Sequence, residues 1–443
     1  MPGHVACTAP AERDVLQTGF NKRDRILKAI LDPEATTREK LEQARAAAPQ
    51  LASLSTEQKN EILREMAAAL ESRTAEILAA NQKDLTESNL EGPLRDRLLL
   101  TCERIDAIVQ GLRDVANLPD PVGKTVAEWD RPNGLKIRKM TVPLGVLGVI
   151  FESRPNVTVD AVALAIKSGN AIVLRGGKEA AHSNRSLVAI LTSVRGLPEG
   201  AIRLLDSSSR ASVQELIAAR GLVDVIIPRG GSGLIEHVVT NSKVPVIETG
   251  AGNCHIFVDN SADFDMAERI ILNAKTQRPS VCNAAEKVLI HHAIAEEFTP
   301  RIVKKLIECG VEVRADAEAT RLSSGLPVQG ATEKDWGEEY LCLCLAIRIV
   351  AGVEEAIAHI NHYSTKHSEV IVTSDEERAR RFLRGIDSAA VYWNASTRFS
   401  DGSEFGFGAE MGISTQKLHC RGPFALAELT STKYEVFGTG QIR

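Results

Sequence analysis

From Val146 onward, short apolar runs alternate with segments of helical periodicity, and this alternation constrains the possible fold most. The apolar runs are Val146–Phe151, Ala171–Leu174, Ile202–Leu205, Val223–Ile227 and Val244–Ile247. The helical segments between them are centred near residues 163, 188, 214 and 236. Strands that are apolar throughout and alternate with helices are typical of a parallel sheet covered on both faces. The pattern therefore predicts a Rossmann-type domain, which binds ligands at the carboxyl ends of its strands.

The loops that follow these predicted strands are rich in glycine and in basic residues. They are Glu152–Asn156, Arg175–Lys178, Arg229–Ser232 and Glu248–Gly252. Glycine lets the backbone approach a ligand closely and cations attract phosphate, so the loops together favour a phosphate-bearing cofactor, with Gly230, Gly231 and Ser232 in its site. Neither a Gly-x-Gly-x-x-Gly nor a Walker sequence is present. Each loop alone is therefore also compatible with an ordinary turn between a strand and a helix.

A second alternating region follows Val258, with strand-like runs at Val288–His291, Cys344–Val350 and Glu369–Val372. We expect it to form a second α/β domain. Between residues 125 and 142, the sequence Pro132-Asn-Gly134 is followed by alternating apolar and basic residues, which predicts a β-hairpin that turns at Asn-Gly.

Cys282 lies near the start of the second region, where a polar helical run breaks at Pro279. A thiol at such a break can face a cleft, with Arg278, Lys275 and nearby backbone N–H groups to lower its pKa and make it a nucleophile. The alternative is a buried structural cysteine. The chain has eight cysteines, scattered without the spacing of a disulfide scaffold or a zinc site. We therefore expect reduced thiols and no metal.

Composition excludes several classes of protein. A formal net charge of −5, 4% aromatic residues and the lack of a polybasic tract argue against nucleic acid as a partner. No apolar run approaches the ~20 residues that span a bilayer. The first 36 residues lack the apolar core of a signal peptide. We expect a cytoplasmic protein without a membrane partner.

Five stretches of the chain match long motifs of one known family. They are Val142–Asp160, Leu174–Lys178, Ala274–Asn283, Asn394–Phe399 and Ser414–His419. On these stretches, and on a similarity that runs from about residue 38 to the end, the chain resembles the gamma-glutamyl phosphate reductases, or glutamate-5-semialdehyde dehydrogenases. That family is a branch of the aldehyde dehydrogenase superfamily. The resemblance implies an α/β, aldehyde dehydrogenase-like fold with a Rossmann-type parallel-sheet cofactor domain, a second α/β catalytic domain and a small β oligomerisation arm.

The domain organisation expected from these patterns has five parts. They are an N-terminal extension (residues 1–36), a cofactor domain (37–124 and 142–258), a catalytic domain (259–395), a return segment to the cofactor domain (396–425) and an arm (125–141 and 426–443). The arm resembles the oligomerisation arms of the superfamily, which implies a homo-oligomer, a dimer or larger. Functional coupling to a glutamate 5-kinase is compatible with the resemblance.

The resemblance also implies a reaction. Cys282 attacks the acyl phosphate of L-glutamyl 5-phosphate, expels phosphate and forms a thioester, which NADPH reduces to L-glutamate 5-semialdehyde in the second step of proline biosynthesis. A thiolate suits this sequence because it is both a strong nucleophile and a workable leaving group. One alternative is a water-using NAD(P)-dependent aldehyde dehydrogenase on the same fold. Another is a catalytically silent relative kept for cofactor binding or assembly.

Three further residues receive roles from the resemblance. Asn156 matches the asparagine whose amide holds the developing oxyanion, although it is also a residue type that caps helices. Glu248 matches the glutamate that activates water in the oxidising enzymes, a step that a phosphorylating reductase does not need. Glu339 matches a glutamate that contacts the nicotinamide ribose, and the alternative is a solvated charge at a helix end.

Four basic residues complete the predicted site. Arg175 takes the place of a lysine that touches the adenosine ribose, and Lys178 replaces an acid that binds both ribose hydroxyls in NAD-preferring members. A cation at that place attracts a 2′-phosphate, so NADPH is expected over NADH. Arg278 and Arg154 are candidates to bind the substrate's carboxylate or phosphate. The alternative for both is an ion pair at the domain boundary.

Overall fold

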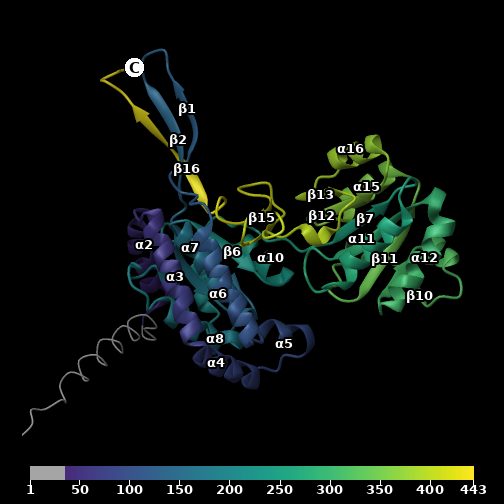
Figure 1. Cartoon of the computed structure of the whole chain (residues 1–443), viewed down its shortest axis with the longest axis horizontal. Coiled ribbons are helices and arrows are strands. Elements are labelled where there is room, and N and C mark those ends of the chain that lie inside the picture. The colour runs from purple at the N-terminus through teal and green to yellow at the C-terminus, as the bar shows by residue number, and fades with distance from the viewer. Residues whose placement is uncertain (1–34) are drawn as a thin grey trace, which may run out of the picture.

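The structure is a computed structural model that describes residues 35–443. It contains two α/β domains and a three-stranded arm that projects from the first domain (Figure 1). The expected N-terminal extension lies outside the described residues, apart from positions 35 and 36.

The first domain contains a four-stranded parallel sheet. In chain order its strands are β3 (Val146–Phe151), β4 (Ala171–Arg175), β5 (Ile202–Leu204) and β6 (Val225–Arg229). Their order across the sheet is β5-β4-β3-β6, and all neighbouring pairs are parallel. Chain order therefore reverses between β3 and β6, which is the point where open α/β sheets bind dinucleotides.

One predicted strand of this sheet is wrong. The run Val244–Ile247 forms only an isolated bridge between Val246 and Ile226. Pro245 lies inside the run and has no N–H to donate to a ladder, which accounts for the missing strand.

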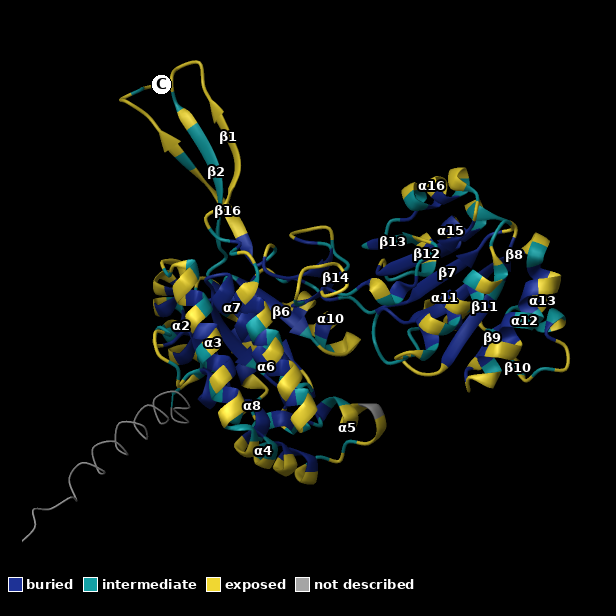
Figure 2. Cartoon of the chain, in the orientation of Figure 1, coloured by how far each residue is buried: buried dark blue, intermediate teal, exposed yellow. Residues whose placement is uncertain are grey.

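Helices cover this sheet on both sides. Those that follow its strands are α7 (Pro155–Lys167), α8 (Ala181–Leu191), α9 (Ala211–Ala218) and α10 (Ser232–Asn241), and the short 3-10 helix η1 (Lys178–Ala180) precedes α8. The N-terminal helices are α2 (Thr37–Ala52), α3 (Thr56–Ser72), α4 (Thr74–Glu87), α5 (Gly92–Leu98) and α6 (Cys102–Asn117). Capping boxes at Thr36 and Ser55 start α2 and α3. Apart from α5 and η1, these helices join the strands through their apolar faces in one buried core (Figure 2).

The second domain is built on a seven-stranded parallel sheet with the order β10-β9-β11-β8-β7-β12-β13. The strands are β7 (Cys254–Val258), β8 (Ala285–His291), β9 (Glu312–Ala315), β10 (Val328–Gly330), β11 (Cys344–Val350), β12 (Ser368–Val372) and β13 (Ala390–Trp393). The helices are α11 (Phe264–Thr276), α12 (Ala295–Glu308), α13 (Ala317–Leu322), α14 (Glu333–Gly337), α15 (Val353–Tyr363) and α16 (Glu376–Gly385). The 3-10 helices η2 (His292–Ile294) and η3 (Thr397–Phe399) complete the domain.

The boundary expected after residue 258 therefore falls one strand too late. Strand β7 pairs with β8 and β12 of the second sheet and has no ladder with the first. An apolar strand does not reveal from its own sequence which sheet it joins, because the pairing partners come later in the chain.

The return segment and the arm connect back to the first domain. Strands β14 (Gly412–Ser414) and β15 (Gly422–Phe424) pair with each other, and β14 bridges to Thr249. The arm consists of β1 (Thr125–Asp130), β2 (Lys136–Pro143) and β16 (Thr430–Phe437), with β2 between the other two. Gly134 supplies the positive φ of the predicted turn. Figure 2 shows β1 and most of β16 exposed and β2 between them intermediate, in contrast to both buried sheets.

Candidate active site

Cys282 lies in the turn between α11 and β8, on the side of the second domain that faces the first. The turn is held by several contacts. The Cys254 thiol donates to the Cys282 carbonyl oxygen over 3.2 Å. The Thr397 hydroxyl donates to the Asn283 carbonyl oxygen over 2.6 Å, and Gly252 packs against the Cys282 backbone. The nucleophile predicted from the sequence therefore sits on a fixed turn.

The thiol is a weak acid in this structure. Burial raises the pKa of Cys282 to about 11, with Glu410 and Glu339 acting in the same direction, while Arg229 and Arg154 act against them. The thiol is therefore protonated at neutral pH.

The expectation that Lys275 and Arg278 lower this pKa is wrong. Lys275 is buried on the inner face of α11 and forms an ion pair with Glu286, with 3.0 Å between Nζ and Oε2. Arg278 is exposed, and it is not among the main groups that act on the Cys282 pKa. Desolvation of the thiol outweighs the cations near it.

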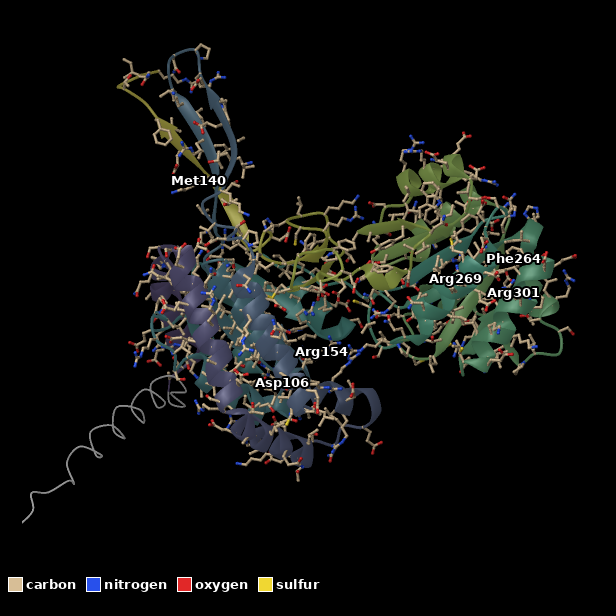
Figure 3. All side chains as sticks on the ribbon, in the orientation of Figure 1. Asp106, Met140, Arg154, Phe264, Arg269 and Arg301 are labelled. Atoms are coloured by element: carbon tan, nitrogen blue, oxygen red, sulfur yellow. The ribbon has the colours of Figure 1, made fainter. Side chains whose placement is uncertain are left out.

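Arginines from distant parts of the chain gather beside Cys282. The pKa of Arg154 is lowered to about 10, first by burial and then by Arg97, Arg229 and Arg278. The pKa of Arg398 is lowered by burial and by Arg278, and Cys282 acts on it in the opposite direction. In Figure 3, Arg154 lies where the first domain faces the second. These five residues, called the arginine cluster below, could bind an anionic substrate.

Sequence analysis identified Arg154 and Arg278 but missed the other three members of the cluster. Arg97 is in α5, Arg229 ends β6 and Arg398 is in η3. Arg97 is anchored by a 2.7 Å bond to the Ser280 carbonyl oxygen, close to the nucleophile in the chain. Arg229 and Arg398 do lie in stretches that the sequence analysis had marked, so their positions carried a usable signal.

Asn156 lies in the first turn of α7, and its Nδ2 donates to Asp160 Oδ2 over 3.1 Å. It is not the cap of this helix, because Arg154 occupies the N-cap position. Ser153, directly before this N-cap residue, has a φ of 36°, and both its N–H and its hydroxyl donate to Glu179 Oε1 over 2.7 Å. A strained backbone held in this way is typical of a functional loop.

The predicted cofactor residues surround the carboxyl ends of β4 and β6. Arg175 donates to the carbonyl oxygens of Ser207 and Ser209 over 3.2 and 3.3 Å. Lys178 is exposed at the start of η1. Gly231 caps α10, and its N–H donates to Glu152 Oε2 over 2.9 Å. Backbone N–H groups at such a helix start suit a phosphate.

A cavity of about 540 Å³ lies beyond these loops, between the ends of β4 and β5 and the start of α2. Its lining includes Lys40, Gly176, Arg185, Asp206, Ser207 and Ser209. Basic and hydroxyl side chains next to Arg175 fit the adenosine end of a phosphorylated cofactor. Glycine at 176 is required there, because a Cβ would collide with the Asn184 amide.

The two predicted glutamates differ in their surroundings. Glu339 accepts a 2.6 Å bond from the Gly252 N–H, and burial raises its pKa. It therefore lies beside the Cys282 turn. Glu248 is held through its own N–H, which donates to Gln416. The carboxylates that act most strongly on the thiol are Glu410 and Glu339.

Residues 35–443 contain no group of three or more His, Cys, Asp and Glu side chains that could hold a metal ion. In the same part of the chain, no helix is both long and apolar enough to cross a membrane.

A Rossmann-type domain, a second α/β domain that presents a cysteine towards it, and a projecting β arm define the fold of the aldehyde dehydrogenases. The Aldehyde dehydrogenase family model matches residues 21–323. A solved acetylating aldehyde dehydrogenase from Geobacillus thermoglucosidasius shares this fold, with 20% identity, a TM-score of 0.65 and coverage of 95% of this chain and 99% of that one.

Much closer relatives narrow the class. The gamma-glutamyl phosphate reductase of Koribacter versatilis is 69% identical over 408 residues, which cover 92% of this chain and 100% of the relative. That of Thermoanaerobacter pseudethanolicus is 54% identical, covering 91% and 99%. The crystal structure of the Thermotoga maritima enzyme of the same name superposes with a TM-score of 0.89 at 47% identity, covering 92% and 100%. The chain belongs to the gamma-glutamyl phosphate reductase branch of the aldehyde dehydrogenase family.

Proposed function

We propose that this chain reduces L-glutamyl 5-phosphate to L-glutamate 5-semialdehyde and releases phosphate, the second step of proline biosynthesis. The observation that carries the proposal is the arginine cluster beside Cys282. The substrate carries a carboxylate at one end and an acyl phosphate at the other, and guanidinium groups bind both by charge-assisted hydrogen bonds. The names of the close relatives point to the same substrate.

The chain's own residues account for formation of the thioester. The Cys282 sulfur attacks the acyl carbon, its proton passes to solvent or to the departing phosphate, and the bond from the acyl carbon to the phosphate oxygen breaks. Arg154 and Arg229 favour the thiolate because they act against the burial that raises the pKa of Cys282. We assign Arg154 and Arg278 to substrate binding within the same cluster.

Asn156 and the backbone N–H at Cys282 would stabilise the developing oxyanion. Loss of one such donor typically lowers the rate by ~10²–10³. The same two donors serve the second half of the reaction, in which the thioester becomes an aldehyde and the thiolate leaves. When bound, the nicotinamide cofactor supplies the reducing equivalents for that half.

As a member of the aldehyde dehydrogenase family, the chain uses a nicotinamide cofactor. We assign Gly230, Gly231 and Ser232 to its diphosphate and Glu339 to the nicotinamide ribose. We further assign NADPH rather than NADH, because Arg175 donates to Ser207 and Ser209, which line the cavity at the predicted adenosine end, and Lys178 begins the helix η1 that follows. A Lys178→Glu variant should lose most of the preference for NADPH in kcat/KM. Equal kcat/KM for the two cofactors in the unchanged protein would contradict the assignment.

The water-using alternative depends on Glu248. The test measures NADP-dependent oxidation of glutamate semialdehyde, with and without phosphate, for the unchanged protein and for Cys282→Ala. The reductase predicts oxidation only when phosphate or arsenate is present, and none in the variant. Oxidation without either anion would favour the water-using enzyme with Glu248 as its base. Full activity of Cys282→Ala would overturn the assignment of Cys282 as the nucleophile. A complete lack of activity in the unchanged protein would favour the alternative of a catalytically silent protein.

We also propose that the chain forms a dimer or larger homo-oligomer through its arm. Strands β1 and β16 are both edges, and they expose apolar side chains, namely Val126, Trp129, Tyr434, Val436 and Phe437. Exposed apolar edges of this kind pair with other chains. Light scattering of the unchanged protein and of a Trp129→Lys/Val436→Lys double variant tests this, and a monomeric unchanged protein would contradict it.

A cytoplasmic location and coupling to a glutamate 5-kinase are the remaining proposals. All seven cysteines in residues 35–443 are free thiols, which fits a reducing compartment. An acyl phosphate hydrolyses readily, so direct supply from the kinase would protect it. Faster turnover in a mixture of the two enzymes than diffusion allows would support the coupling.

A further inference from the structure

Asn156 and Asp160 form a pair on one face of α7. They are four residues apart, so their side chains lie above one another on the helix surface. The Nδ2 of Asn156 donates to Asp160 Oδ2 over 3.1 Å. No other hydrogen bond of the Asn156 side chain occurs within residues 35–443. The amide predicted to stabilise the oxyanion is therefore oriented by one carboxyl group.

The pair shares its surroundings with the nucleophile. Arg229, at the end of β6, acts electrostatically on both Asp160 and Cys282. The guanidinium of Arg229 also lies 3.9 Å from Glu410, the carboxylate that acts most strongly on the thiol. Asp160 and the reacting sulfur therefore both lie within the electrostatic reach of Arg229.

The chemistry of the two groups gives the contact a direction. A carboxamide has a donating end and an accepting end, whereas an ionised carboxylate only accepts. The Asp160 carboxylate therefore accepts a hydrogen bond from the Nδ2 of Asn156 and repels the amide oxygen Oδ1. Because Nδ2 carries two hydrogens, one is left for a substrate oxygen. Burial raises the pKa of Asp160 to about 6, against its bond to Asn156 and the charge of Arg229, so the group is ionised at neutral pH.

We propose that Asp160 is a positioning residue for the reaction, because its carboxylate fixes the Asn156 amide with one N–H directed at the acyl oxygen of the substrate. The proposal rests on the proposed function, since it assumes that Asn156 is the oxyanion donor. An uncharged residue at 160 would let the amide turn over and present Oδ1, which repels the developing negative charge.

A double-mutant cycle tests the proposal. Phosphate-dependent oxidation of glutamate semialdehyde is measured for the unchanged protein, Asp160→Asn, Asn156→Ala and the double variant. We expect Asp160→Asn to lower kcat by ~10–100-fold with KM nearly unchanged, and to change kcat by less than ~2-fold when Asn156 is already alanine. A purely structural role would lower kcat in both backgrounds. Asp106→Asn is the matched control, because it removes an exposed carboxylate from α6 of the same domain.

The outcomes separate this inference from the proposed function. An unchanged kcat in Asp160→Asn, or an equal loss in both backgrounds, overturns the role of Asp160 alone. An unchanged kcat in Asn156→Ala overturns the oxyanion assignment as well, and a lack of phosphate-dependent activity in the unchanged protein overturns the reductase. Thermal unfolding and cofactor binding verify that each variant folds. Asp160→Ala is measured alongside as a second variant, because a methyl group needs no partner, and the same pattern is expected from it.

Discussion

The backbone of Gly252 lies directly against the backbone of Cys282. A Cβ atom on Gly252 would fall 2.8 Å from the Cys282 Cα atom and would overlap its carbonyl group. The N–H of the same glycine donates to Glu339 over 2.6 Å. Gly252 therefore joins the nucleophile turn to the glutamate assigned to the nicotinamide ribose, and only glycine fits between them.

Gly252→Ala should abolish most of the activity while the rest of the fold survives. The added methyl group must push the Cys282 turn away, and a misplacement of about 1 Å in a reacting group can cost ~10²-fold in rate. The measurement is kcat in the phosphate-dependent assay. Gly111→Ala in α6 is the control, because its new Cβ meets no atom within 4 Å. Equal activity of the two variants would contradict the close contact.

Glu410→Gln should make the Cys282 thiol more acidic, whereas Glu248→Gln should leave it unchanged. Glu410 is the first of the charged groups that raise the pKa of Cys282, and removing its charge lowers that pKa. Since one pKa unit is a tenfold change in thiolate, alkylation of Cys282 by iodoacetamide near pH 8 should become several-fold faster. Mass spectrometry of the peptide that contains Cys282 gives the rate. A larger effect of Glu248→Gln than of Glu410→Gln on the alkylation rate would show that Glu248 acts on the Cys282 thiol.

Local sequence patterns were sufficient for most of the architecture. The run Val146–Phe151 coincides with β3, and Cys344–Val350 coincides with β11, because a strand buried on both faces has an uninterrupted apolar sequence. The hairpin at Gly134 was predictable from turn chemistry alone. These features depend on residues that are neighbours in the chain.

The parts that were missed depend on residues far apart in the chain. Arg97 reaches the site from α5, and its local sequence indicates no role in binding. Arg398 reaches it from η3, within the motif Asn394–Phe399, which indicates the family but not which of its residues meets the nucleophile. The direction of the Cys282 pKa shift was also wrong, because nearby cations were visible in the sequence but the burial of the thiol was not. The prediction of the sheet that β7 joins was wrong for the same reason, because its partners β8 and β12 follow later in the chain.

Glu152→Gln should strengthen cofactor binding. In this structure the Glu152 carboxylate accepts the Gly231 N–H at the start of α10, the place assigned to the cofactor diphosphate. A Cβ on Gly230 would lie 2.5 Å from the same oxygen, so the carboxylate fills that corner of the loop. Removing its charge removes competition for a shared donor, and the Kd for NADPH should fall by ~3–10-fold.

Fluorescence titration of NADPH measures this Kd. Glu236→Gln, which changes an exposed carboxylate on the same helix, is the matched control. Weaker binding in Glu152→Gln would show that the carboxylate supports the bound loop conformation rather than competing with the diphosphate.

The buried carboxyl group of Glu369, which lies beside His255, should make the second domain less stable as the pH rises. Burial raises the pKa of Glu369 to about 8 and lowers the pKa of His255 to about 3. At neutral pH the carboxyl group is therefore protonated and the imidazole is neutral, with 3.3 Å between Oε2 and Nδ1.

An unfolded glutamate has a pKa of about 4.3, so between about pH 4.3 and pH 8 unfolding releases a proton that the folded chain keeps. The stabilisation from Glu369 is complete below that window and is lost as the pH rises through it, by up to about 1.4 kcal/mol per pH unit. His255 contributes with the opposite sign below about pH 6.5, because its folded pKa is lowered, so the comparison with Glu369→Gln isolates the carboxyl group. Urea unfolding followed by tryptophan fluorescence at about pH 5.5, 6.5, 7.5 and 8.5 should therefore show a steeper decline for the unchanged protein than for Glu369→Gln. Glu377→Gln on the exposed start of α16 should decline like the unchanged protein, and parallel curves for all three proteins would show that Glu369 is ionised in the fold.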